Sequence, residues 1–101
     1  MLTFNLKKQW FDKIKRGEKT HEYREVKEYW TKRLFEHYYI YGIKSCNEKE
    51  ECELVCGYAS KDDKGKRLNA KIKSISIVNG KNTDLAVDRD VYDIEFELIR
   101  E

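Results

Sequence analysis

The stretch from Gly17 to Trp30 concentrates residues that can hold protons, anions and aromatic bases. A lysine beside a carboxylate, such as Lys19 and Glu22, can hold a phosphate or polarise a carbonyl, and the carboxylate can accept a proton. Arg24 adds a planar fork of donors that suits phosphate or guanine. These three residues are the candidate ligand-binding group, and Lys19 and Glu22 are the candidate catalytic residues if the protein is an enzyme.

Aromatic side chains near this group offer faces for a nucleobase. Tyr23, Trp30 and Tyr58 are the candidates, and a stacked base is typically worth about 1–3 kcal/mol. Each proposed role has an ordinary alternative. Trp30 also suits a core between a helix and a sheet, and Glu22 with Arg24 also suits an ion pair that only stabilises the fold.

An extended conformation over 20–24 places Glu22 and Arg24 on one face and Tyr23 on the other, because side chains alternate along a strand. Lys19 has the opposite parity to Glu22, but it follows a glycine at which the chain turns. Two positions therefore remain open for its ammonium group. A turn brings it beside Glu22, and without that turn it points to water.

The remaining pattern predicts an α+β domain. Alternation predicts a first strand at 2–6, and basic residues followed by Gly17 predict the end of a helix over 7–16. Further elements are expected in this order: a strand at 20–24, a helix at 26–36, β-prone residues at 38–43, a turn at 47–51, and strands at 53–58, 70–78 and 92–98. The strand at 70–78 needs a bulge to keep its apolar residues on one face. The cleanly alternating last strand is expected to be central. About five or six strands with two early helices suit a small curved sheet or barrel with helices packed on it.

Length and charge limit the functional classes. The 101 residues suit a single domain, 1–101, with one core. Charged residues reach 40%, yet 21 basic residues face 19 acidic ones, so the net charge is only +2. Proteins that bind nucleic acid non-specifically usually carry a clear basic excess. Any anion site in this chain must therefore be local.

The sequence also predicts where the protein is located and whether it holds a metal or a cofactor. The chain has no apolar run of the roughly 20 residues that cross a bilayer, and its first residues do not have the layout of a signal peptide. We therefore expect a cytoplasmic protein that makes no membrane contact. Cys46, Cys52 and Cys56 do not have the paired spacing of a zinc site, and His21 and His37 are isolated. The expectation is reduced thiols, Cys56 in the core, ordinary histidines, and neither metal nor cofactor.

One motif resembles a known family. Gly17, Lys19, Glu22 and Arg24, placed directly after a glycine-terminated helix, resemble the Gly-x-Lys-x-x-Glu-x-Arg signature of the ASCH family, which shares the PUA-like barrel. The stretches 28–34, 57–62 and 90–99 resemble a short phage and bacterial branch of that family.

The resemblance implies a β-barrel of about five or six strands with a cleft lined by Lys19, Glu22 and Arg24. It implies binding of RNA or of a nucleoside or nucleotide ligand. Some relatives hydrolyse an acylated cytidine such as N4-acetylcytidine, and some cut RNA. In the hydrolysing branch a lysine like Lys19 works with a threonine and a distant glutamate. Here Glu22 stands in place of the threonine, and the distant acid has no assigned position. Three functions remain open: a binding domain, a hydrolase that uses the same cleft, and a non-catalytic interaction or phage accessory domain.

Overall fold

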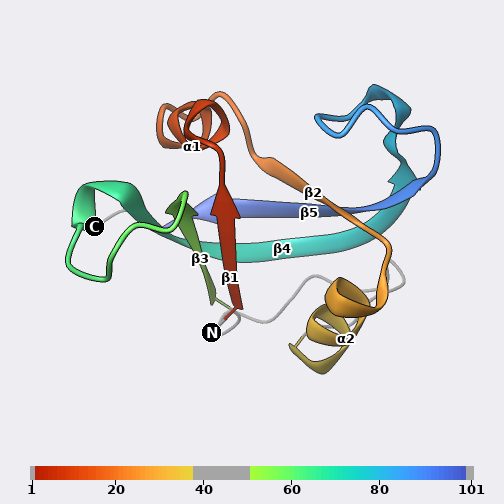
Figure 1. Cartoon of the computed structure of the whole chain (residues 1–101), viewed down its shortest axis with the longest axis horizontal. Helices are drawn as coiled ribbons and strands as arrows, with labels where there is room; N and C mark the ends of the chain where they lie inside the picture. The colour runs from red at the N-terminus through yellow and green to blue at the C-terminus, as the bar shows by residue number, and fades with distance from the viewer. Residues whose placement is uncertain (1, 38–50, 100–101) are drawn as a thin grey trace.

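The computed structural model describes residues 2–37 and 51–99, with side chains for 2–34 and 51–99. In this part the protein is a small α+β fold in which one five-stranded sheet curls into a half-barrel with two helices (Figure 1). The elements are β1 (Leu2–Leu6), α1 (Lys8–Lys15), β2 (His21–Glu25), α2 (Glu28–His37), β3 (Glu51–Cys56), β4 (Arg67–Asn79) and β5 (Asp90–Leu98), with short 3-10 turns η1 (Lys64–Lys66) and η2 (Gly80–Asn82). None of the described helices is long and apolar enough to span a membrane.

The sheet has the order β1-β3-β4-β5-β2. β1 pairs with β3 in parallel, and the other pairs are antiparallel. β5 lies between β4 and β2, which confirms the prediction that the last strand is not at an edge. The two strands at the edges of the sheet are therefore β1 and β2, although they are consecutive strands along the chain.

Alternation along the strands fills one concave core. β1 buries every second residue, as predicted, and β5 buries Tyr92, Ile94 and Phe96 while Leu98 is partly exposed. The largest fully buried side chains are Phe4, Ile14, Leu34, Leu54, Ile72, Ile75 and Ile94. The two helices supply Phe11, Ile14 and Leu34 to this core.

The predicted end of the first helix is confirmed. Gly17 has φ +81°, a backbone conformation that residues with a Cβ rarely adopt. Its N–H donates to Ile14 O at 2.9 Å, and Glu18 N donates to Lys13 O at 2.9 Å. This glycine turn ends α1 and directs the chain into β2.

The bulge predicted for the strand at 70–78 is also present. Ile72 pairs with Phe96, and Ser74 pairs with Glu95, so Lys73 is an extra residue without a partner in the register. Because the extra residue shifts the alternation by one, both Ile72 and Ile75 are buried.

Some boundaries differ from the sequence-based expectation. α2 begins at Glu28, so Val26 precedes the helix and is exposed. Glu51 belongs to β3 and not to a turn, while the predictions for 38–43 and for 47–50 lie outside the described residues.

The predicted strand at 53–58 ends earlier than expected. Gly57 takes φ +61° and turns the chain, so Tyr58 lies beyond β3 with 92% of its surface exposed. The thiol in the core also differs from the prediction. Cys56 packs against the core but stays partly exposed at the end of β3, and the fully buried thiol is that of Cys52.

Candidate functional site

Lys19 lies beside Glu22, as the turn at Gly17 allows. Its Nζ is 3.6 Å from Glu22 Oε1, and its side chain is only 9% exposed. The alternative in which Lys19 points to water is therefore wrong. The same ammonium group also forms an ion pair with the carboxylate of Asp84.

Asp84 is a residue that sequence reasoning missed. It lies 65 residues after Lys19, in the loop between η2 and β5. The loop is held tightly at Gly80, where an added Cβ would lie 2.8 Å from Val91 Cγ1 and 2.9 Å from Val87 O. No periodic pattern surrounds Asp84, so the sequence offered only the Asn79-Gly80 turn signal as a hint of this loop.

Glu22 is held on two sides by Lys19 and Arg24. Arg24 Nη2 lies 2.8 Å from Glu22 Oε2, and Tyr23 N donates to Glu22 Oε1 at 3.3 Å. Burial raises the pKa of the Glu22 carboxyl, and the nearby charges of Arg24 and Lys19 partly offset this rise. The expected shared face of Glu22 and Arg24 is confirmed, because they pair with the buried Ile94 and Tyr92 of β5.

Arg24 connects this group to the core. Its guanidinium carbon lies 5.0 Å from the Trp30 ring centroid and 5.4 Å from that of Phe4. Nη2 also donates to the backbone oxygen of Asn5 at 3.0 Å. Trp30 and Phe4 stack with their centroids 5.4 Å apart. Trp30 therefore packs between a helix and the sheet. This was the ordinary alternative to a role in stacking a nucleobase.

The other face of β2 carries a second polar group. His21 Nδ1 lies 2.6 Å from Asp93 Oδ1, and His21 Nε2 lies 3.7 Å from Glu95 Oε2. The rings of His21 and Tyr23 are nearly parallel, at 14°. Burial is the main cause that raises the pKa of Tyr23, and the Asp93 carboxylate adds to it.

Lys19 also lies near two aromatic rings. Its Nζ is 5.1 Å from the Tyr23 centroid and 5.5 Å from the Trp10 centroid. Both distances are within the range of a cation–π interaction. Trp10 comes from α1, Tyr23 from β2 and Asp84 from the loop before β5, so three separate segments meet at this ammonium group.

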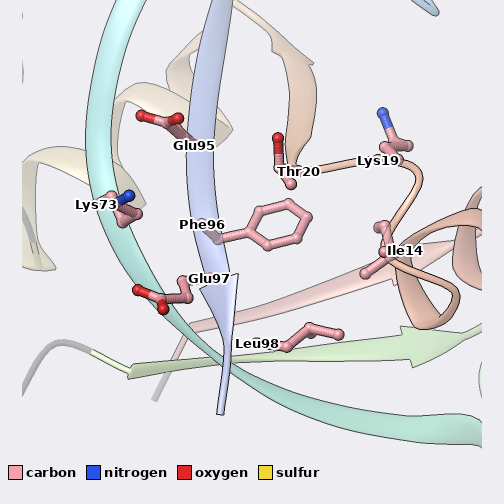
Figure 2. A pocket seen from close by; sticks show the side chains of 9 residues that line it. Ile14, Lys19, Thr20, Lys73, Glu95, Phe96, Glu97 and Leu98 are labelled. Carbon is pink, nitrogen blue, oxygen red and sulfur yellow. The ribbon is translucent and has the colours of Figure 1, made fainter. Parts of the chain in front are cut away.

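Two hollows open at this place. The smaller, of about 280 Å³, is lined by Trp10, Lys13, Glu18, Lys19, Thr20, His21, Tyr23 and Asp84. The larger, of about 550 Å³, is lined by Ile14, Gly17, Lys19, Thr20, Lys73, Glu95, Phe96, Glu97 and Leu98 (Figure 2). Lys19 and Thr20 are common to both. Among the sequence-predicted site residues, Lys19 and Tyr23 line these hollows, whereas Glu22, Arg24, Trp30 and Tyr58 do not.

The charges that line the hollows cancel. The smaller hollow has Lys13 and Lys19 against Glu18 and Asp84. The larger has Lys19 and Lys73 against Glu95 and Glu97, and Figure 2 shows Lys73 on the same side as these two glutamates. A ligand in either hollow therefore meets paired charges of both signs and no excess of positive charge.

The arrangement can bind a small planar polar ligand. Aromatic rings, an ammonium group, carboxylates and an imidazole surround a space near the lower end of the usual size of small-molecule pockets. In the described part of the chain, no cluster of three or more His, Cys, Asp or Glu side chains is placed to hold a metal ion. No protein-family model, curated protein or solved structure matches the chain.

Proposed function

We propose that this protein is an ASCH-like domain of the PUA type that binds a nucleoside-type ligand at Lys19. The observation that carries the proposal is the position of the Lys19 ammonium group, between the rings of Trp10 and Tyr23 and beside the carboxylate of Asp84. The rings supply apolar faces for a base, and the charged groups supply hydrogen-bond partners for its polar edge.

The balance of charge favours an uncharged nucleoside over RNA. Each phosphate that a protein holds is usually matched by Lys or Arg. Here Lys19 already has Glu22 and Asp84 as partners, and the other lining charges cancel as well. RNA and nucleotides remain within the proposal as weaker ligands, because their phosphates meet no net positive field.

The test is a titration followed by NMR. The isotopically labelled protein is titrated with cytidine, N4-acetylcytidine, cytidine monophosphate and a short single-stranded RNA. We expect shifts at Lys19, Tyr23 and Trp10 with the two nucleosides, and loss of binding in Lys19→Met. Tyr58→Ala is the control, because this side chain is 92% exposed and lies outside both hollows.

Two results would reject the proposal. Shifts that Lys19→Met does not remove would place the ligand elsewhere on the molecule. No shifts with any of the four ligands would favour the third function, a non-catalytic interaction or phage accessory domain.

A hydrolase is the second candidate, and a specific observation favours it. Asp84 supplies a carboxylate from a distant part of the chain at the same ammonium group that Glu22 contacts. It could serve as the distant acid that the resemblance requires. The check is the release of acetate from N4-acetylcytidine, or the shortening of an RNA, and the loss of that turnover in Lys19→Met.

A further inference from the structure

The His21 side chain is oriented as a proton acceptor. Asp93 Oδ1 lies 2.6 Å from Nδ1, so Nδ1 carries the hydrogen and donates it to this carboxylate. That tautomer leaves a free lone pair on Nε2. Asp93 is 18% exposed and His21 is 37% exposed, so the pair is anchored on one side and reachable from solvent on the other.

The surroundings of His21 hold the ring in place. The ring lies nearly parallel to that of Tyr23, at a centroid distance of 6.3 Å. Glu95 Oε2 lies 3.7 Å from Nε2, which is beyond hydrogen-bond distance. Glu95 in turn accepts a hydrogen bond from the Ser74 hydroxyl at 3.4 Å.

His21 lines the same 280 Å³ hollow as Lys19. An ammonium group has three hydrogens. Asp84 accepts one of them, and Glu22 Oε1 at 3.6 Å is beyond hydrogen-bond distance, so at least one hydrogen remains for a ligand. A base with a bound orienting carboxylate, in the same hollow as a cation, supplies the groups that activate water and stabilise an oxyanion.

The charge balance of the hollow indicates which bond is attacked. A phosphodiester carries a negative charge that Lys19, already shared by two carboxylates, does not neutralise. An acyl group is uncharged in the ground state and gains negative charge only in the transition state, where one remaining donor suffices.

From this geometry we infer that His21, oriented by Asp93, is the general base for hydrolysis of an acyl group on the ligand bound at Lys19. His21 Nε2 takes a proton from water as the water oxygen bonds to the carbonyl carbon. The carbonyl electron pair moves to its oxygen, which Lys19 holds. The bond from carbon to the leaving nitrogen then breaks, and that nitrogen receives the proton from Nε2. The products are a carboxylic acid and an amine, and His21 returns to its neutral form. The inference rests on the proposed function, because it requires the ligand in this hollow.

The experiment measures hydrolysis and binding of one probe, N4-acetylcytidine, in the full chain. Release of cytidine is followed by chromatography, and affinity is measured by NMR titration. We expect His21→Ala to lower kcat/KM by about 10²–10⁴-fold while it still binds the probe. Added imidazole should restore part of the rate, which a residue with only a structural role would not show. Asp93→Asn should lower the rate as well, because it no longer fixes the tautomer.

The control is Ser76→Ala. Ser76 lies opposite Asp93 on β4 but lines neither hollow, so this variant should hydrolyse the probe like the wild type. Binding without any hydrolysis by the wild type would overturn this inference and leave the proposed function standing. Full activity in His21→Ala would overturn the inference in the same way. Absence of binding by the wild type would remove both.

Discussion

The guanidinium of Arg24 donates a hydrogen bond to the backbone oxygen of Asn5 at 3.0 Å, and so joins the two outermost strands of the sheet. β1 and β2 do not pair with each other in the described sheet. A side chain, with Phe4 and Trp30 against it, connects the two edges where a closed barrel would have backbone bonds. Arg24 is therefore a structural residue as well as the partner of Glu22.

Arg24→Ala should destabilise the fold by about 3 kcal/mol at neutral pH, because it leaves a buried carboxylate without its closest cation. Urea denaturation measures this loss. In a Glu22→Gln background the same substitution should cost clearly less, since no carboxylate at position 22 is left without its partner. An equal cost in both backgrounds would assign the whole effect to Asn5 and to packing.

Glu22 should make stability depend on pH in a defined direction. Its pKa in the folded protein is raised above the ordinary value of 4.5 by burial, so the folded state favours the protonated form. The stability from this group is fully present below about pH 4.5 and is lost as the pH rises through the folded pKa. Relative to Glu22→Gln, the wild type should therefore lose stability from about pH 4.5 upward, and thermal melts over roughly pH 4–8 measure the difference. A constant difference across that range would contradict the raised pKa.

Asp84→Asn should change ligand preference. Removing one of the two acids that line the smaller hollow leaves an excess of positive charge there. Affinity for cytidine monophosphate should rise relative to cytidine by about fivefold, which corresponds to about 1 kcal/mol. Calorimetric titration of both ligands measures the ratio, and Asp62→Asn, in an exposed loop, is the charge-matched control. An unchanged ratio of the two affinities would show that the charge of Asp84 does not set the ligand preference.

Trp30→Leu should lower stability before it affects binding. The indole packs on Phe4 and against Arg24, so a smaller side chain leaves a gap worth about 1–3 kcal/mol. Chemical denaturation gives the stability, and titration of the folded variant gives the affinity. Weakened binding in a variant of unchanged stability would instead restore Trp30 to the ligand site.

Cys52 should react with thiol reagents only when the chain unfolds. Burial raises the pKa of its thiol to about 12, so almost no thiolate is present at neutral pH. Cys56 is partly exposed and should react first. Mass spectrometry after timed alkylation in a Cys46→Ser background separates the two. Rapid labelling of Cys52 in the native protein would contradict the buried β3 register.

Sequence patterns within a few residues predicted the parts of the fold that depend on near neighbours in the chain. The alternation in β1 and β5 and the turn at Gly17 were visible in the sequence, because each depends on residues within a few positions. The same turn left two positions open for Lys19, and the structure has the one beside Glu22. The end of β3 at Gly57 was missed, since a glycine within a β-prone run does not reveal its φ angle.

The contacts between distant segments were outside the reach of sequence reasoning. The Lys19–Asp84 pair depends on how the loop after Gly80 folds, and the Arg24–Asn5 bond depends on the curl of the whole sheet. The His21–Asp93 contact requires less information, because it depends only on how two neighbouring strands pair. Two adjacent antiparallel strands in the correct register place these residues on one face, but the sequence does not provide the register.

The bulge at Lys73 decides where β4 can change its length. Ile72 pairs with Phe96, Ser74 with Glu95 and Ile75 with Ile94, so deletion of Lys73 would close the bulge and keep both isoleucines inward. Loss of a residue after Ile75 would instead turn the end of the strand over. The exposed loop residues 60–62 have no such constraint and should accept an inserted tag or a lost residue. Length variation in natural or engineered versions of this domain is therefore expected in that loop and, within β4, only at the bulge.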